Sequence, residues 1–158
     1  MQATPDMALL LVPGLLGFGA SALCPVGRNN AGNDVPFRPP AAAFGVVWPV
    51  LYLLLGACLR LAARGRDAAG GAALAALVAA LTAWIPVTSC ASLKREGVWL
   101  LLVAILACGY AMVIDRRYAL LLLPLLVWLS FATLMSAWSV GVQGMKDSGP
   151  LGGSYFLR

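Results

Sequence analysis

The chain has 158 residues, of which 61% are hydrophobic and only 11% are charged, with a formal net charge of +5. A soluble domain has about 25% charged residues, so this composition excludes a soluble globular fold. Nucleic-acid binding requires a basic face on a folded domain, whereas here the charges lie in short stretches between long apolar runs. We therefore expect a membrane protein that contacts the lipid bilayer and has no nucleic-acid partner.

Five apolar runs follow one another along the chain. They cover residues 7–23, 41–63, 68–92, 98–114 and 118–140. At about 1.5 Å per residue, about 20 residues cross a hydrocarbon core of about 30 Å. The first run lacks the basic start of a signal peptide, and four similar runs follow it, so we expect it to be retained. The sequence predicts an all-α integral membrane bundle of five transmembrane helices over residues 1–142, with a flexible tail over 143–158.

Lys and Arg residues gather at the ends of these runs, where they anchor helices at the membrane surface. If all five runs cross the membrane, the basic residues are divided almost evenly between its two sides. The positive-inside rule therefore predicts no orientation.

Several reactive residue types are absent from the apolar runs. The chain has no histidine, and its acidic residues all lie between the runs or at the ends of the chain. Proton-driven carriers generally have a carboxylate at membrane depth, so we do not expect that mechanism. The cysteines, Cys24, Cys58, Cys90 and Cys108, show no C-x-x-C spacing and indicate neither a redox pair nor a metal site. We predict no metal, no cofactor and no catalytic residue.

Tryptophan and proline are the residues in the apolar runs that indicate a binding site. Trp84 and Trp128 lie deep in their runs, where an indole needs a partner for its N–H or a ligand to pack against. Trp99 lies near the start of its run and fits a position at the membrane surface. Pro86 removes a backbone hydrogen bond inside the third run, which predicts a kink, either beside a pocket or from packing alone.

Small residues recur every four positions in the third run. Ala72, Ala76 and Ala80 share one face, and small residues at this spacing let membrane helices approach closely. This face is either a contact within the bundle or a contact between two copies in a homodimer.

Three segments have a distinctive order of aromatic and proline residues. They are FRPPAAAFGVVWPVLYLLLGACLR at 37–60, WIP at 84–86 and LLLPLLVWLSFATLM at 121–135. Together they resemble the first loop and second helix, the third helix and the fifth helix of the TspO/MBR family, the translocator proteins once called peripheral-type benzodiazepine receptors. The resemblance extends from about residue 7 to residue 142.

This resemblance implies a five-helix bundle whose pocket is closed at one end by the loop between the first two helices. It implies flat apolar ligands, namely porphyrins such as protoporphyrin IX and sterols, and a receptor or translocator in a bacterial cell membrane or mitochondrial outer membrane. The expected ligand-binding residues are Trp48, Tyr52, Trp84, Pro86, Trp99, Trp128, Phe131 and Ala132. Arg28 and Arg38 are candidates to pair with porphyrin propionates.

Two other functions stay open at this point. One is a membrane enzyme that degrades the porphyrin, as has been proposed for the family, although the residues offer little acid–base or redox chemistry. The other is a structural or interaction protein that has lost its ligand pocket. The second alternative depends on departures from the family pattern: Val46 replaces the proline after Phe-Gly, and Leu81 replaces an asparagine.

Overall fold

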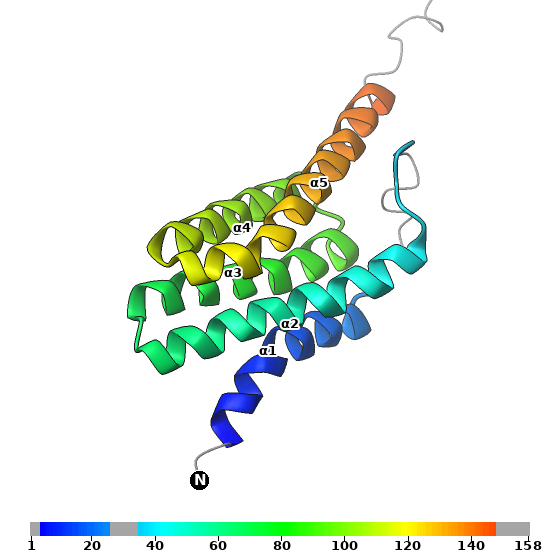
Figure 1. Ribbon diagram of the computed structural model, residues 1–158. Helices are drawn as coiled ribbons and strands as arrows, with labels where there is room; N and C mark the ends of the chain where they lie inside the picture. Colours follow the sequence, from blue (N-terminus) through cyan, green and yellow to red (C-terminus); the bar gives the residue numbers. More distant parts are fainter. Residues whose placement is uncertain (1–3, 26–34, 148–158) are drawn as a thin grey trace, which may run out of the picture.

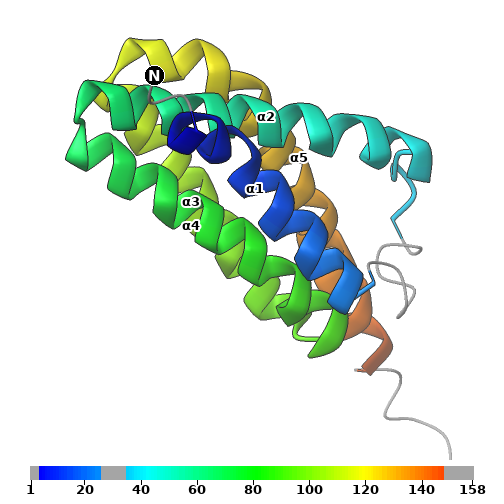
Figure 2. The ribbon, with the colours of Figure 1, turned by 90° about the horizontal axis from the view of Figure 1, so that it is seen from below.

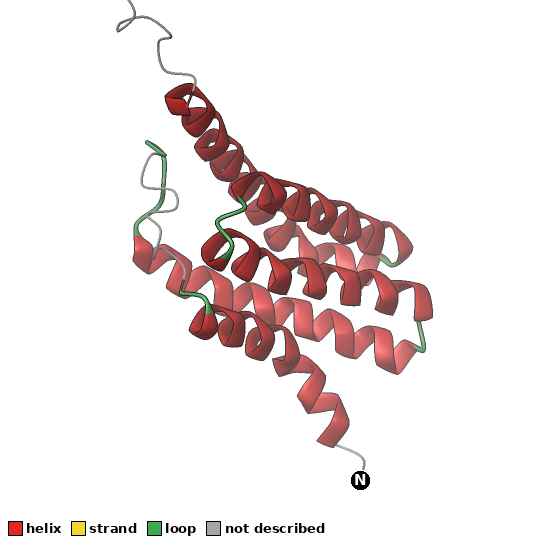
Figure 3. Cartoon of the chain, turned by 180° about the vertical axis from the view of Figure 1, so that it is seen from behind, coloured by secondary structure: helices red, strands yellow, loops and turns green. Residues whose placement is uncertain are grey.

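The computed structural model describes residues 4–25 and 35–147, with side chains for 7–25 and 35–142. The helices are α1 (Thr4–Leu23), α2 (Ala41–Gly65), α3 (Ala68–Ile85), the short π-helix η1 (Pro86–Cys90), α4 (Lys94–Ile114) and α5 (Arg116–Asp147) (Figure 1). The described residues contain no strand (Figure 3). The predicted all-α fold is confirmed.

Four of the described segments are long and apolar enough to cross a membrane. They cover Ala41–Gly65, Ala68–Cys90, Lys94–Ile114 and Arg116–Val142, whereas the apolar part of α1, Met7–Leu23, is shorter. Large apolar side chains such as Leu106, Val113 and Leu120 are exposed on the outside of the bundle. A lipid environment accepts such side chains, and the helices form an integral membrane bundle.

The helices form a closed ring. Helix α1 packs against α2, α2 against α5, α5 against α4, α4 against α3, and α3 against α1, with a further contact between α2 and α3. Buried leucines from α2, α3, α4 and α5 meet inside this ring, among them Leu55, Leu74, Leu101 and Leu129. Each helix therefore has one side toward the other helices and one side toward lipid.

The two ends of the bundle differ in composition. We call the end with the α2–α3 turn and the α4–α5 turn the polar end. We call the end with the start of α2, the end of α3 and the start of α4 the aromatic end. Helix α5 continues to Asp147, past residue 143, where the tail was expected to begin, and its last turns project beyond the other helices in Figure 1.

The third apolar run is not one continuous α-helix. Helix α3 ends at Ile85 and passes into the π-helix η1 at Pro86, which has no N–H to donate. The Ala91 N–H donates to the Pro86 carbonyl at 2.9 Å, and the Thr88 hydroxyl donates to the Trp84 carbonyl at 2.7 Å. The irregularity expected at Pro86 takes the form of a π-helical turn.

Two of the cysteines form a disulfide that the sequence reasoning did not predict. Cys24, just after α1, is bonded to Cys90, at the end of η1, with 5.5 Å between their Cα atoms. Helices α1 and α3 run side by side in the same direction, which brings these distant residues together (Figure 2). The other two, Cys58 and Cys108, are free thiols buried in the bundle, as expected for small apolar residues.

The small-residue face of α3 is divided between two environments. Ala72 and Ala76 are exposed, whereas Ala80 is buried inside the bundle. Only Ala72 and Ala76 are therefore accessible to a second copy of the chain, and the homodimer stays a prediction.

Candidate functional site

Aromatic side chains from α2 and α5 meet near the aromatic end. Phe44, Trp48 and Tyr52 are spaced four residues apart on α2, which places them on one helix face. Trp128 and Phe131 face them from α5. The ring centroids of Trp128 lie 5.5 Å from Phe44, 6.4 Å from Trp48 and 5.8 Å from Phe131. Trp48 and Tyr52 are 5.3 Å apart. We call these five residues the aromatic cluster.

The segment before α2 extends the cluster toward the end of α5. The Phe37 ring lies 6.3 Å from Phe131 and 5.7 Å from Trp138. The Arg38 guanidinium lies over the Phe44 ring, 5.9 Å from its centroid. Arg38 is thus at the cluster as the sequence reasoning expected, whereas Arg28 lies outside the described residues.

Two indole N–H groups near this end have no hydrogen-bond partner. They belong to Trp84 and Trp128, and both nitrogens are buried. The indole nitrogen of Trp84 faces the first turn of α4, since a Cβ added to Gly97 would lie 3.3 Å from it. A buried unpartnered donor costs about 1–3 kcal/mol. Among the described residues, two other buried side-chain atoms lack a hydrogen-bond partner, namely Nε of Arg60 and Oγ of Ser139.

The expected site residues are only partly brought together. Trp48, Tyr52, Trp128 and Phe131 are in the aromatic cluster, and Ala132 is buried one turn after Trp128. Trp84 packs against α4 instead, and Pro86 lies on the side of α3 that faces α1.

Trp99 departs from the expectation of a pocket inside the bundle. Its side chain is 64% exposed and lies on the outer side of α4 in line with Val103 and Leu106, which are also exposed. This position fits the membrane-surface role that the sequence also allowed.

Sequence reasoning missed four aromatic residues of this region: Phe37, Phe44, Trp138, and Phe18 of α1, whose ring centroid lies 5.6 Å from that of Tyr52. Phe44 lies one helical turn before Trp48, so the i, i+4 spacing was a usable signal. No local pattern links Phe37 with Trp138, because their contact depends on how the segment before α2 lies across the end of α5.

Two hollows lie elsewhere, along α1. One has a volume of about 390 Å³ and is lined by Leu9, Leu59, Ala62, Ala63, Arg66, Asp67, Ala68 and Gly71. The other has a volume of about 620 Å³ and is lined by residues of α1, α2 and α3 from Leu9 to Pro86. Neither of these two hollows is lined by a tryptophan.

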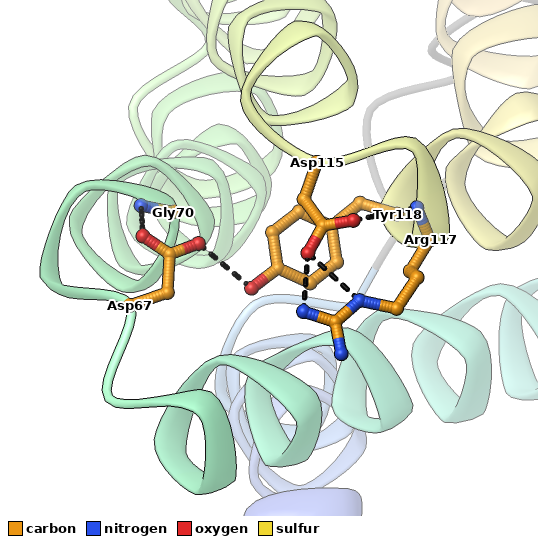
Figure 4. A network of polar contacts seen from close by, with 5 residues as sticks. All are labelled: Asp67, Gly70, Asp115, Arg117 and Tyr118. Atoms are coloured by element: carbon orange, nitrogen blue, oxygen red, sulfur yellow. Dashed lines mark hydrogen bonds and ion pairs between the residues drawn. The ribbon is translucent and has the colours of Figure 1, made fainter.

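Hydrogen bonds connect the two turns of the polar end (Figure 4). The Asp67 carboxylate accepts from the Gly70 N–H and from the Tyr118 hydroxyl, each at 2.9 Å. The first bond caps the N-terminus of α3, and the second joins that cap to α5. Asp67 therefore holds the α2–α3 turn against the start of α5.

Asp115 and Arg117 form a second group in the same view. The Arg117 backbone N–H and Nε each donate to Asp115 at 2.8 Å, and Nη2 donates at 2.6 Å. These hydrogen bonds hold the pKa of the Asp115 carboxyl below its usual range. Both residues are at the surface, so the pair orders the α4–α5 turn more than it stabilises the fold.

The TspO/MBR family matches the chain over residues 8–140, which include part of every described helix and nearly all of their apolar residues. No curated protein matches the chain.

Proposed function

Because the chain belongs to the TspO/MBR family, we propose that this multi-pass membrane protein is a receptor or translocator that binds a flat apolar ligand at the aromatic end. The ligand class is a porphyrin, with a sterol as the second candidate. The ligand would contact Trp48, Trp128, Phe131 and Ala132 between α2 and α5, together with Tyr52, whose ring lies between Trp48 and α1. Trp84 and Pro86, on α3 and η1, would border the site, while Trp99 lies outside it.

The observation that supports this proposal most strongly is the unpartnered indole N–H of Trp128 inside the aromatic cluster; the unpartnered N–H of Trp84, which faces the first turn of α4, is at the border of the proposed site. A buried donor without an acceptor is rare in folded proteins, because it loses its hydrogen bond to water without replacement. An acceptor on a bound ligand would remove this cost. A porphyrin, which has both carboxylates and ring nitrogens, offers such acceptors.

The side chains near these donors favour a flat ring. Indole and phenyl faces pack well against planar molecules, and Ala132 leaves room one turn away from Trp128. The positive charge of Arg38 beside Phe44 favours a ligand with a carboxylate at its edge. The rings now touch one another, so binding requires that the side chains of α2 and α5 move apart.

Titration of the purified protein in detergent with protoporphyrin IX, followed by porphyrin absorption, tests this proposal. Trp128→Phe and Trp84→Phe keep an aromatic ring but remove the N–H donor. Because one hydrogen bond contributes about 0.5–1.5 kcal/mol, each variant should bind about 2-fold to 10-fold more weakly. Circular dichroism checks that each variant is folded.

Trp99→Phe is the matched control, since it changes the same side chain on the outer side of α4. Its affinity for protoporphyrin IX should equal that of the wild type. Non-saturable uptake of the same size in the wild type and all three variants would mean partition into detergent. That result would contradict the proposal and favour a structural role for the bundle.

A further inference from the structure

The two hollows along α1 adjoin each other. Leu9 and Leu59 line both, the first hollow reaches the α2–α3 turn at Arg66, and the second reaches Cys24 and Pro86 near the aromatic end. We call the combined depression the α1–α3 groove. It is separate from the aromatic cluster, which lies between α2 and α5.

The groove forms because α1 packs closely against α2. A Cβ at Gly56 would collide with the Leu10 backbone, and one at Gly17 would collide with the Tyr52 ring. These two glycines let α1 and α2 approach closely. On the α3 side, the groove is lined by the small residues Ala75, Ala79 and Ala83, which leave the space between α1 and α3 unfilled.

The groove is long enough to hold one lipid chain. Along α3 it extends from Ala68 to Pro86, which is about 27 Å at the rise of an α-helix, whereas one lipid leaflet is about half of the hydrocarbon thickness of about 30 Å. The larger hollow alone, at about 620 Å³, is within the range of about 300–1,000 Å³ that is usual for ligand sites. The Cys24–Cys90 disulfide joins the two helices at one end of the groove.

The lining restricts the chemistry of the occupant. In the larger hollow Thr82 has the only hydroxyl group, and all other lining residues are apolar. Such a site suits a hydrocarbon chain, which needs no hydrogen bonds, and it is unsuited to a ligand with several polar groups.

The polar end of the groove is suited to an anion. Arg66 lines it and is exposed at the C-terminus of α2. The neighbouring carboxylate of Asp67 already accepts hydrogen bonds from Gly70 and Tyr118. The Arg66 guanidinium lies beside the apolar lining of the α1–α3 groove, at the membrane surface. There it can pair with the phosphate of a lipid whose acyl chain lies in the groove.

We propose that the α1–α3 groove binds one acyl chain of an anionic phospholipid, whose phosphate pairs with Arg66. No residue of the aromatic cluster lines this lipid site, and Pro86, at the border of the proposed ligand site, is the one residue that the two sites share. The lipid fills the space between α1 and α3 that the protein leaves open.

Native mass spectrometry of the full chain tests the site. The protein is incubated in detergent with equal amounts of palmitoyl-oleoyl phosphatidylglycerol and palmitoyl-oleoyl phosphatidylcholine. The wild type should retain one phosphatidylglycerol per chain. Ala79→Trp fills the groove and should abolish this retention, whereas the matched control Leu106→Trp, on the outer side of α4, should leave it unchanged.

Arg66→Gln provides a second variant that leaves the apolar lining intact. It should lower the preference for phosphatidylglycerol over phosphatidylcholine about fivefold, which corresponds to the loss of one basic side chain near an anionic lipid. This variant keeps the proposal testable if Ala79→Trp does not fold, which far-UV circular dichroism reports.

Three outcomes would overturn the proposal. Equal retention in Ala79→Trp and Leu106→Trp would mean that the lipid belongs to the general shell around the bundle. Cholesterol can be added as a competitor. If it replaces phosphatidylglycerol on the wild type and does not bind Ala79→Trp, the groove is a sterol site. A lipid-free dimer that Ala79→Trp dissociates would show that a second copy of the chain covers the groove.

Discussion

The polar end and the aromatic end of this bundle are held together by different forces. At the polar end, Asp67 joins the α2–α3 turn to Tyr118 of α5 through directional hydrogen bonds. At the aromatic end, the rings of α2 and α5 are in contact, and the Cys24–Cys90 disulfide ties α1 to the end of α3. Two indole donors there, those of Trp84 and Trp128, have no partner.

This difference indicates which end of the bundle can move to accommodate a ligand. Hydrogen bonds depend strongly on distance and angle, so the polar end permits little movement of its helices. Ring contacts are less directional, and the rings can shift while the disulfide keeps α1 and α3 together. The aromatic end is therefore the part of the bundle in which a ligand can be accommodated without loss of the fold.

The largest expected effect comes from the covalent link at the aromatic end. Cys24→Ser combined with Cys90→Ser should lower the free energy of unfolding by about 3 kcal/mol, because the disulfide closes a long loop in the unfolded chain. Thermal unfolding in detergent, followed by circular dichroism, measures this loss. Cys58→Ser is unsuitable as the control, because it places a hydroxyl group at a buried position. The matched comparison is the wild type treated with a reductant, which breaks the same disulfide.

A wild type that unfolds at the same temperature with and without reductant would contradict this prediction. The aromatic end would then depend on ring contacts alone, and the two ends would both rely on non-covalent contacts.

A smaller loss is expected at the polar end. Asp67→Ala removes the helix cap and leaves the Tyr118 hydroxyl, on a side chain that is 1% exposed, without its acceptor. The combined effect should lower the free energy of unfolding by about 2 kcal/mol. Asp67→Asn keeps one oxygen that can accept from the Gly70 N–H, and its NH2 group can donate to the Tyr118 hydroxyl oxygen, so it should lose less than half as much. Equal losses in the two variants would show that these hydrogen bonds do not hold the polar end.

The smallest effect concerns the surface pair at the same end. Since hydrogen bonds from Arg117 lower the pKa of Asp115 in the folded protein, the pair contributes stability above the unfolded pKa of about 3.9. This contribution is lost as the pH falls through the lowered pKa. Asp115→Asn should therefore reduce the fall in melting temperature between pH 5 and about pH 3. An identical fall in the variant would mean that other carboxylates account for it.

The sequence was informative wherever a feature depends on neighbours along the chain. The apolar runs gave most helix ends to within a few residues, because helix formation in a membrane follows from continuous apolar sequence; the exceptions are the break of the third run at Ile85 and the end of α5 at Asp147. The spacing of Trp48 and Tyr52 placed them on one face of α2, since four residues make about one turn. The family followed from the order of short motifs.

The sequence was less informative about which face of each helix points inward. In a soluble protein a polar stripe marks the outer side of a helix, but in a membrane helix the lipid-facing side is as apolar as the core. Trp99 and Trp128 therefore look equivalent in the sequence, although one is exposed to the outside and the other contacts Trp48.

By itself, the sequence determined that this chain is a helical membrane bundle of the TspO/MBR family with aromatic residues at defined positions on each helix. Only the tertiary structure decided that Cys24 pairs with Cys90, that Trp128 meets Trp48, and that a groove opens between α1 and α3. The physical reason is that these features depend on how closely neighbouring helices approach. Single small residues such as Gly56 set that approach, and their partner helix is not encoded in any local pattern.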